Sequence, residues 1–97
     1  MNVPPRDGVR VNHEDLKQFV AEAAGVAGLP KDRAEQLAGW LTENDLRGVV
    51  SHGTQQIATY ARLMRDGVLN NQPSVEVAKE TPVSVLMDGD GGLGYFP

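Results

Sequence analysis

Residues 45–53, with the sequence DLRGVVSHG, separate two segments that have the apolar spacing of helices. The segment before them has an apolar stripe made of Ala34, Leu37, Ala38 and Leu41. The segment after them has a second stripe made of Ile57, Tyr60, Ala61 and Met64. Gly48 and the β-branched pair that follows it are poor helix formers. We therefore expect the first of these helices to stop near Asp45 and the second to start near Ser51 or Thr54.

A further helix is expected upstream, beginning after Asn12, which is a favourable N-cap residue. Asp15 lies in its first turn, where a negative charge interacts well with the helix dipole. Its apolar positions are Leu16, Phe19, Val20 and Ala23. Gly25 and Gly28 are expected to end it, and Pro30 can open the next helix.

The helical spacing of apolar residues stops after Gly67, which is expected to end the third helix. Residues 70–74 are typical of a loop, and alternating apolar residues then predict two short strands, near residues 75–78 and 83–87. The fold class is therefore predicted to be α+β, with about three helices followed by two strands, which could form a hairpin. We divide the chain into a leader (1–11), a helical domain (12–72) and the start of a β-containing domain (73–97). Because two strands leave open sheet edges, we expect the chain to be a fragment of a larger fold.

Composition excludes several classes of function. The chain has 13 acidic and 9 basic residues, a net charge of −4 and no cysteine. Without a basic patch, nucleic acid is not an expected partner, and neither is a membrane surface. No metal site is expected from two distant histidines, and no signal peptide or membrane-length apolar run is present. The predicted location is cytoplasmic.

Ser51, His52 and Gly53 are the residues in the sequence that best suit catalysis. A histidine at the start of a helix feels the positive end of its dipole, which disfavours the protonated imidazole. Such an imidazole can exchange a proton with a substrate oxygen, and Ser51 can relay that proton or hold the ring. A structural interpretation also exists, in which Ser51 caps the helix and His52 faces solvent. Asp45 and Arg47 could pair with each other or brace the loop, and we favour a structural role for both.

The order of these features resembles the start of the malate/L-lactate dehydrogenase family, whose fold is not the Rossmann fold. That family includes ureidoglycolate, sulfolactate and Δ1-piperideine-2-carboxylate oxidoreductases. The likeness runs from about Val9 to Gly94. It rests on the opening helix at residues 11–16, the signature at residues 45–53, the Tyr60 helix ending at Asp66-Gly67, the Asn70 loop, and the strand that runs into residues 88–94.

The resemblance implies roles for two residues. Ser51 matches the family's relay serine, and His52 matches its catalytic acid/base, which protonates a carbonyl oxygen as hydride arrives from NAD or NADP. The implied substrate is a small 2-oxo or 2-hydroxy acid, such as malate or lactate, or a related imino acid. The resemblance also implies a homodimer for the parent protein. In the family, the aspartate that orients the catalytic histidine comes later in the sequence than the region resembled here. Because this chain does not include that aspartate, the fragment alone is expected to be inactive.

One position departs from the family's pattern. Well-studied members carry an arginine four residues after the histidine, and it grips the substrate carboxylate, whereas this chain has Gln56. A glutamine donates hydrogen bonds but brings no charge. Gln56 is still the candidate substrate-binding residue. Either another residue supplies the charge, or the substrate differs from a simple 2-oxo acid.

The glycines at 89, 91 and 94 match the spacing of a dinucleotide-binding fingerprint. A true fingerprint opens a helix inside a βαβ unit, and here only three residues follow Gly94. We therefore assign these glycines to tight turns and leave the cofactor-binding residues unassigned.

Two other functions fit the sequence. The first is a stand-alone helical protein-interaction module without catalytic activity, with Trp40 as an anchor; the alternative for Trp40 is a place in the core. The second is a nucleotide-binding module built on Gly89 to Gly94, which would need a helix after Gly94.

Overall fold

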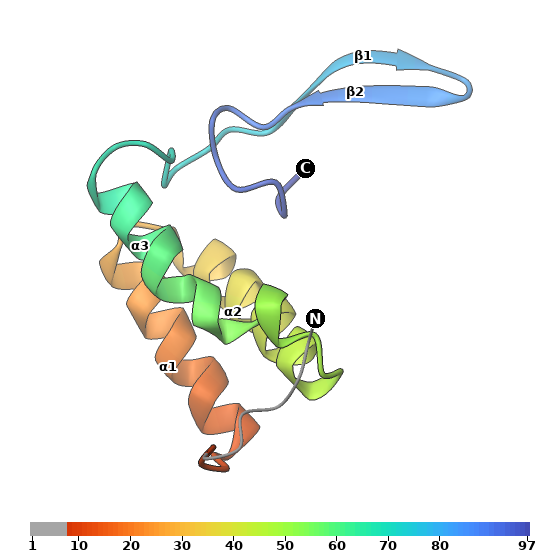
Figure 1. The fold of residues 1–97 in the computed structure, drawn as a ribbon. Coiled ribbons are helices and arrows are strands. Elements are labelled where there is room, and N and C mark those ends of the chain that lie inside the picture. The colour runs from red at the N-terminus through yellow and green to blue at the C-terminus, as the bar shows by residue number, and fades with distance from the viewer. Residues whose placement is uncertain (1–7) are drawn as a thin grey trace.

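The computed structural model describes residues 8–97, so residues 1–7 of the predicted leader lie outside the described residues. The helices are α1 (His13–Val26), α2 (Lys31–Leu46) and α3 (Ile57–Arg65), and two 3₁₀ turns, η1 (Val50–His52) and η2 (Thr54–Gln56), connect α2 to α3. The strands are β1 (Glu76–Thr81) and β2 (Ser84–Asp88). Figure 1 shows the three helices packed together and the strands extending away from them. The predicted α+β fold class is confirmed.

Helix α1 begins as the sequence predicts. The Asn12 side chain accepts hydrogen bonds from the backbone N–H groups of Glu14 and Asp15, at 2.9 and 3.3 Å. The predicted apolar stripe is partly wrong, because Phe19 is 63% exposed. The fully buried residues of this helix are Val20 and Ala24, four positions apart. Leu16, Val20 and Ala23 of the predicted stripe do contact the core, so Phe19 is the member that lies outside the buried face.

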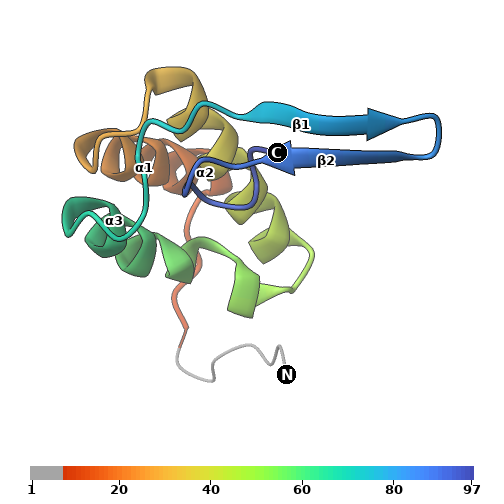
Figure 2. The same cartoon turned by 90° about the horizontal axis from the view of Figure 1, so that it is seen from above.

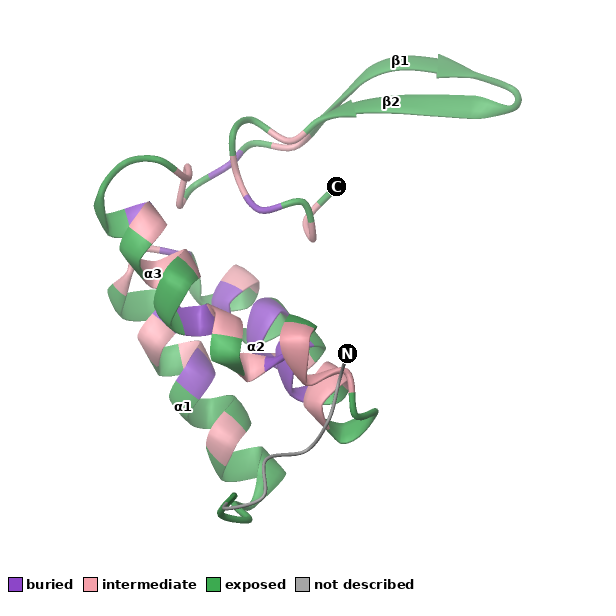
Figure 3. Cartoon of the chain, viewed as in Figure 1, coloured by how far each residue is buried: buried purple, intermediate pink, exposed green. Residues whose placement is uncertain are grey.

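The core lies between α1 and α2 and is completed by α3. All four residues of the predicted stripe on α2 are buried, and Leu37 and Leu41 have no exposed surface. Helix α3 contributes Ile57 and Met64 to the same cluster. In Figure 3 the buried residues lie on the facing sides of the helices. The end of α2 at Leu46 agrees with the predicted stop near Asp45.

Strands β1 and β2 form an antiparallel hairpin, as the simplest interpretation of the sequence predicts. The register joins Glu76 to Asp88 and Thr81 to Ser84, with an irregularity between Val77 and Lys79. Both strands begin one residue later than expected, and every residue in them is exposed. Figure 2 shows that the hairpin projects away from the helices, so neither face of it is covered by them.

The chain after the hairpin returns to the helices. Leu93 is buried in the helical core. The Trp40 ring stacks on Tyr95 with 5.8 Å between ring centroids and lies 6.1 Å from Phe96. Trp40 is thus a partly exposed anchor for the chain's own C-terminal segment. The predicted domain boundary between residues 72 and 73 stays a prediction. Trp40, which precedes this boundary, packs against Tyr95 and Phe96, which follow it.

Candidate functional site

Residues 50–56 are held in two 3₁₀ turns rather than in the first turns of α3. Gly53 separates the turns in an extended conformation, with φ −102° and ψ −152°. Helix α3 begins at Ile57, and η2, which begins at Thr54, runs into it without a gap. The predicted helix start near Thr54 therefore agrees with the structure, whereas a start near Ser51 is wrong. His52 closes η1 instead of opening a helix.

Ser51 and His52 form a hydrogen-bonded pair. The distance between Ser51 Oγ and His52 Nδ1 is 2.8 Å, and the His52 side chain is exposed while Ser51 is partly buried. Because this contact engages Nδ1, Nε2 is the ring nitrogen suited to exchanging a proton with a bound molecule. The two side chains are therefore within hydrogen-bonding distance of each other.

Asp45 braces the turn that follows His52. Its carboxylate accepts a hydrogen bond from the backbone N–H of Thr54, at 3.3 Å to Oδ1 and 3.2 Å to Oδ2, and another from the Thr54 hydroxyl. A Cβ atom at Gly53 would lie 1.7 Å from Asp45 Oδ1. Of the two roles considered for Asp45, the structure shows the brace. Arg47 instead pairs with Glu43, and both side chains are more than half exposed.

Two amide side chains hold the backbone of the same segment. Asn44 Nδ2 donates to the His52 carbonyl at 3.0 Å, and Gln56 Nε2 donates to the Ser51 carbonyl at 2.7 Å. Sequence reasoning missed Asn44, which directly precedes the signature, because its contact depends on how the chain folds back after α2. Gln56, the candidate substrate-binding residue, lies beside Ser51 with one amide hydrogen engaged by the loop.

The glycine-rich segment after β2 is packed against its own chain. A Cβ atom at Gly92 would lie 2.7 Å from Cγ of Pro73. The Asn70 side chain donates to the Asp90 carbonyl and carboxylate at 2.8 and 3.1 Å. No helix follows Gly94 within residues 8–97. This segment therefore closes the base of the hairpin.

The described part of the chain contains no group of three or more His, Asp or Glu residues arranged to hold a metal ion. Among residues 8–97, no helix is both long enough and apolar enough to cross a membrane.

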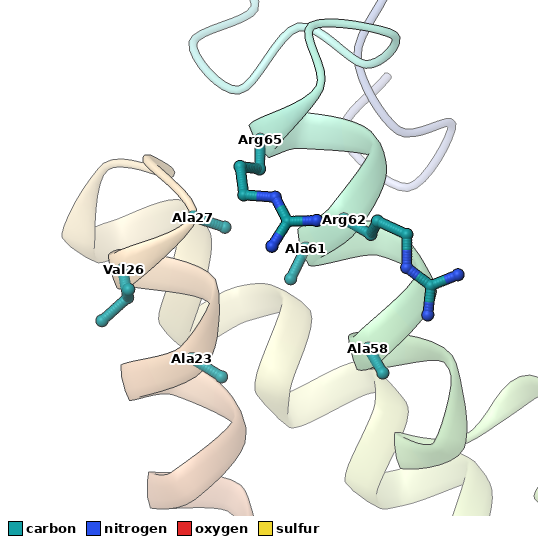
Figure 4. Close-up of a pocket in the computed structure, with 7 residues that line it drawn as sticks. All are labelled: Ala23, Val26, Ala27, Ala58, Ala61, Arg62 and Arg65. Carbon is teal, nitrogen blue, oxygen red and sulfur yellow. The ribbon is translucent and has the colours of Figure 1, made fainter.

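A groove of about 310 Å³ runs between α1 and α3 (Figure 4). Its walls are mostly small side chains such as Ala23 and Ala61, and Arg62 and Arg65 lie along one side. Ser51, His52 and Gln56 do not line this groove. Arg62 and Arg65, as part of this groove, therefore do not provide the positive charge that Gln56 lacks for binding a substrate carboxylate.

Comparison with known proteins identifies the family. Residues 11–96 match the model of the malate/L-lactate dehydrogenase family. The chain belongs to this family. The match covers nearly the whole of the likeness predicted from the sequence, and it includes the Ser51–His52 pair.

Relatives in the malate/L-lactate dehydrogenase family show how much of the fold is present. Malate dehydrogenase from Pyrococcus horikoshii is 37% identical over 86 residues, which cover 89% of this chain and 24% of that protein. L-sulfolactate dehydrogenase from Methanocaldococcus jannaschii is 31% identical over 81 residues and is covered to the same 24%. The solved structure of the Pyrococcus horikoshii enzyme superimposes with a TM-score of 0.85 at 36% identity, over 93% of this chain and 26% of that one. The chain thus spans about a quarter of the length of these relatives.

Proposed function

We propose that this chain contributes the proton-transfer pair of an NAD- or NADP-dependent oxidoreductase that acts on small 2-hydroxy and 2-oxo acids or related imino acids. The observation that carries the proposal is the 2.8 Å contact between Ser51 Oγ and His52 Nδ1 on an exposed turn. Relatives named as malate, L-sulfolactate and L-lactate dehydrogenases support the substrate class.

The chemistry assigned to this chain is a proton transfer. A nicotinamide cofactor, when bound to the complete enzyme, would supply the hydride that reduces the substrate's carbonyl carbon. His52 gives a proton from Nε2 to the carbonyl oxygen as the C=O π bond breaks, and an O–H bond forms. The imidazole becomes neutral, and the Ser51 hydroxyl holds Nδ1 throughout. In the oxidation direction, neutral His52 takes the proton from the substrate hydroxyl.

Fewer residues are assigned to substrate and cofactor binding than to proton transfer. No cofactor-binding residue is assigned. Gln56 keeps one amide hydrogen for a substrate carboxylate while the other holds the Ser51 carbonyl. Homodimer formation, a cytoplasmic location and the absence of nucleic acid and membrane partners stay predictions.

A chimaera tests the proposal. Residues 11–96 would replace the matching quarter of Pyrococcus horikoshii malate dehydrogenase, and malate oxidation would be followed with NAD and with NADP. We expect His52→Ala to lower kcat by about 10²–10⁴-fold, the usual contribution of general acid–base catalysis, while cofactor affinity is retained. His13→Ala is the matched control, because His13 is the chain's other histidine and lies exposed at the start of α1.

Two results would contradict the proposal. One is near-normal turnover in the His52→Ala chimaera. The other is a chimaera that folds and binds cofactor but has no activity with His52 intact, which would favour the interaction-module alternative.

A further inference from the structure

We propose that Asp45 is a positioning residue for His52, acting through Gly53 and Thr54. The inference concerns how the imidazole is held, and only its kinetic consequence rests on the proposed function. Asp45 does not contact the His52 ring in the interactions described above. It acts on the residues that follow the histidine.

The anchor is well placed for this role. Asp45 is partly buried in the last turn of α2, and α2 contributes the fully buried Leu37 and Leu41 to the core. The hydrogen bonds of the Asp45 carboxylate to the Thr54 backbone and hydroxyl tie the start of η2 directly to α2.

The fit between Asp45 and Gly53 restricts the turn further. The carboxylate occupies the space that a Cβ atom at position 53 would fill, because that atom would lie only 1.7 Å from Oδ1. Any side chain at position 53 must displace either the carboxylate or the turn. The two ends of the nine-residue signature are therefore matched to each other, which explains why an aspartate and a glycine stand at this spacing.

The backbone around His52 is held by three side chains, those of Asn44, Asp45 and Gln56. Gln56 holds the carbonyl of Ser51 and Asn44 holds the carbonyl of His52. Asp45 holds the N–H of Thr54, so the backbone is fixed before, at and after the histidine. An exposed imidazole on a short 3₁₀ turn is oriented by these tethers together with the Ser51 hydroxyl.

Nitrogen NMR on the labelled 97-residue chain tests the inference without any activity. We expect Asp45→Ala to shift the tautomer populations of the His52 ring toward those of an unrestrained imidazole. Asp45→Asn keeps the shape and one acceptor oxygen, so it should restore most of the wild-type pattern. Glu43→Gln is the matched control, because Glu43 is an exposed carboxylate on the same helix that pairs only with Arg47 in the described contacts.

A double-mutant cycle tests the link to Gly53. Gly53→Ala alone should lower the urea midpoint, because the methyl group meets the Asp45 carboxylate. The same substitution in an Asp45→Ala background should lower it less, because the obstructing group is gone. Additive effects would overturn the matched-pair argument, and so would His52 tautomers that are the same in Asp45→Ala and wild type.

The kinetic arm uses the chimaera described above. We expect Asp45→Ala to lower kcat by about 10²-fold with an unchanged KM for the cofactor, since misplacing a reacting group by about 1 Å has that effect. Unchanged kcat alongside shifted His52 tautomers would overturn the kinetic claim. If His52→Ala proves active, the proposed function fails, and the NMR result still decides whether Asp45 positions the ring.

Discussion

At the residue scale, the segment around His52 is held mainly by hydrogen bonds between polar side chains and backbone groups. Ser51 is the residue that contacts the His52 ring, whereas Asn44, Asp45 and Gln56 contact the main chain around it. Gln56, at the position where the resemblance implies an arginine, therefore has a structural role in this segment. Its amide nitrogen donates to the Ser51 carbonyl at 2.7 Å.

The Gln56 contact predicts a stability effect. Gln56→Leu keeps much of the side chain's volume but removes the donor to the partly buried Ser51 carbonyl. We expect a loss of about 0.5–1.5 kcal/mol in the free energy of unfolding, the usual net value of one hydrogen bond. Urea unfolding followed by circular dichroism measures it. Gln55→Leu is the control, because Gln55 is the exposed neighbour, and equal losses in the two variants would refute the assignment.

At the element scale, short-range signals account for where the helices begin and end. The Asn12 cap, the stop after Leu46 and the turn at Gly67, which has φ +77°, all follow from local chemistry. The segment between α2 and α3 differs, because Gly53 is extended and divides it into two 3₁₀ turns. The hairpin follows its alternating pattern, although no helix covers either face.

Removing the Asn12 cap should weaken α1. Asn12→Ala leaves the N–H groups of Glu14 and Asp15 without their side-chain acceptor, and N-cap replacements of this kind cost about 1 kcal/mol. Asn12→Ser should retain most of the stability because serine also caps. The free energy of unfolding in urea is the measurement. An Asn12→Ala variant as stable as wild type would show that solvent satisfies these groups equally well.

At the scale of the whole molecule, the C-terminal segment joins distant parts of the chain. The hydroxyls of Tyr60 on α3 and Tyr95 lie 3.2 Å apart, and their rings meet edge to face at 6.2 Å. The guanidinium of Arg33 on α2 lies 4.6 Å from the Phe96 ring centroid. Together with Trp40, these contacts hold the end of the chain against two helices.

This packing makes stability depend on pH in the alkaline range. Burial, the hydrogen bond to Tyr95 and the charge of an ionised Tyr95 together raise the pKa of Tyr60 from 10.0 to about 12. The folded state therefore favours neutral Tyr60, and its contribution is fully present below pH 10 and lost as the pH rises toward about 12. Tyr60→Phe should remove this part of the pH dependence.

Urea unfolding at pH values below and above 10 measures the effect, with ultraviolet absorbance to follow tyrosine ionisation. In Tyr95→Phe, the pKa of Tyr60 should fall only part of the way, because burial is the largest cause of the shift. An alkaline loss of stability that is the same in Tyr60→Phe and wild type would assign it to other groups.

The sequence by itself determined the three helices, the hairpin, the family and the Ser51–His52 pair, because these depend on periodicity, caps and a short motif. Tertiary structure alone decided that Phe19 faces solvent while Ala24 is buried. It also decided that Asp45 reaches Thr54, nine residues away, and that Tyr95 reaches Tyr60, thirty-five residues away. Local patterns reflect the preferences of neighbouring residues, whereas these contacts depend on how the helices pack. The orientation of His52 belongs to the second group, because three side chains from α2 and η2 hold the backbone around it.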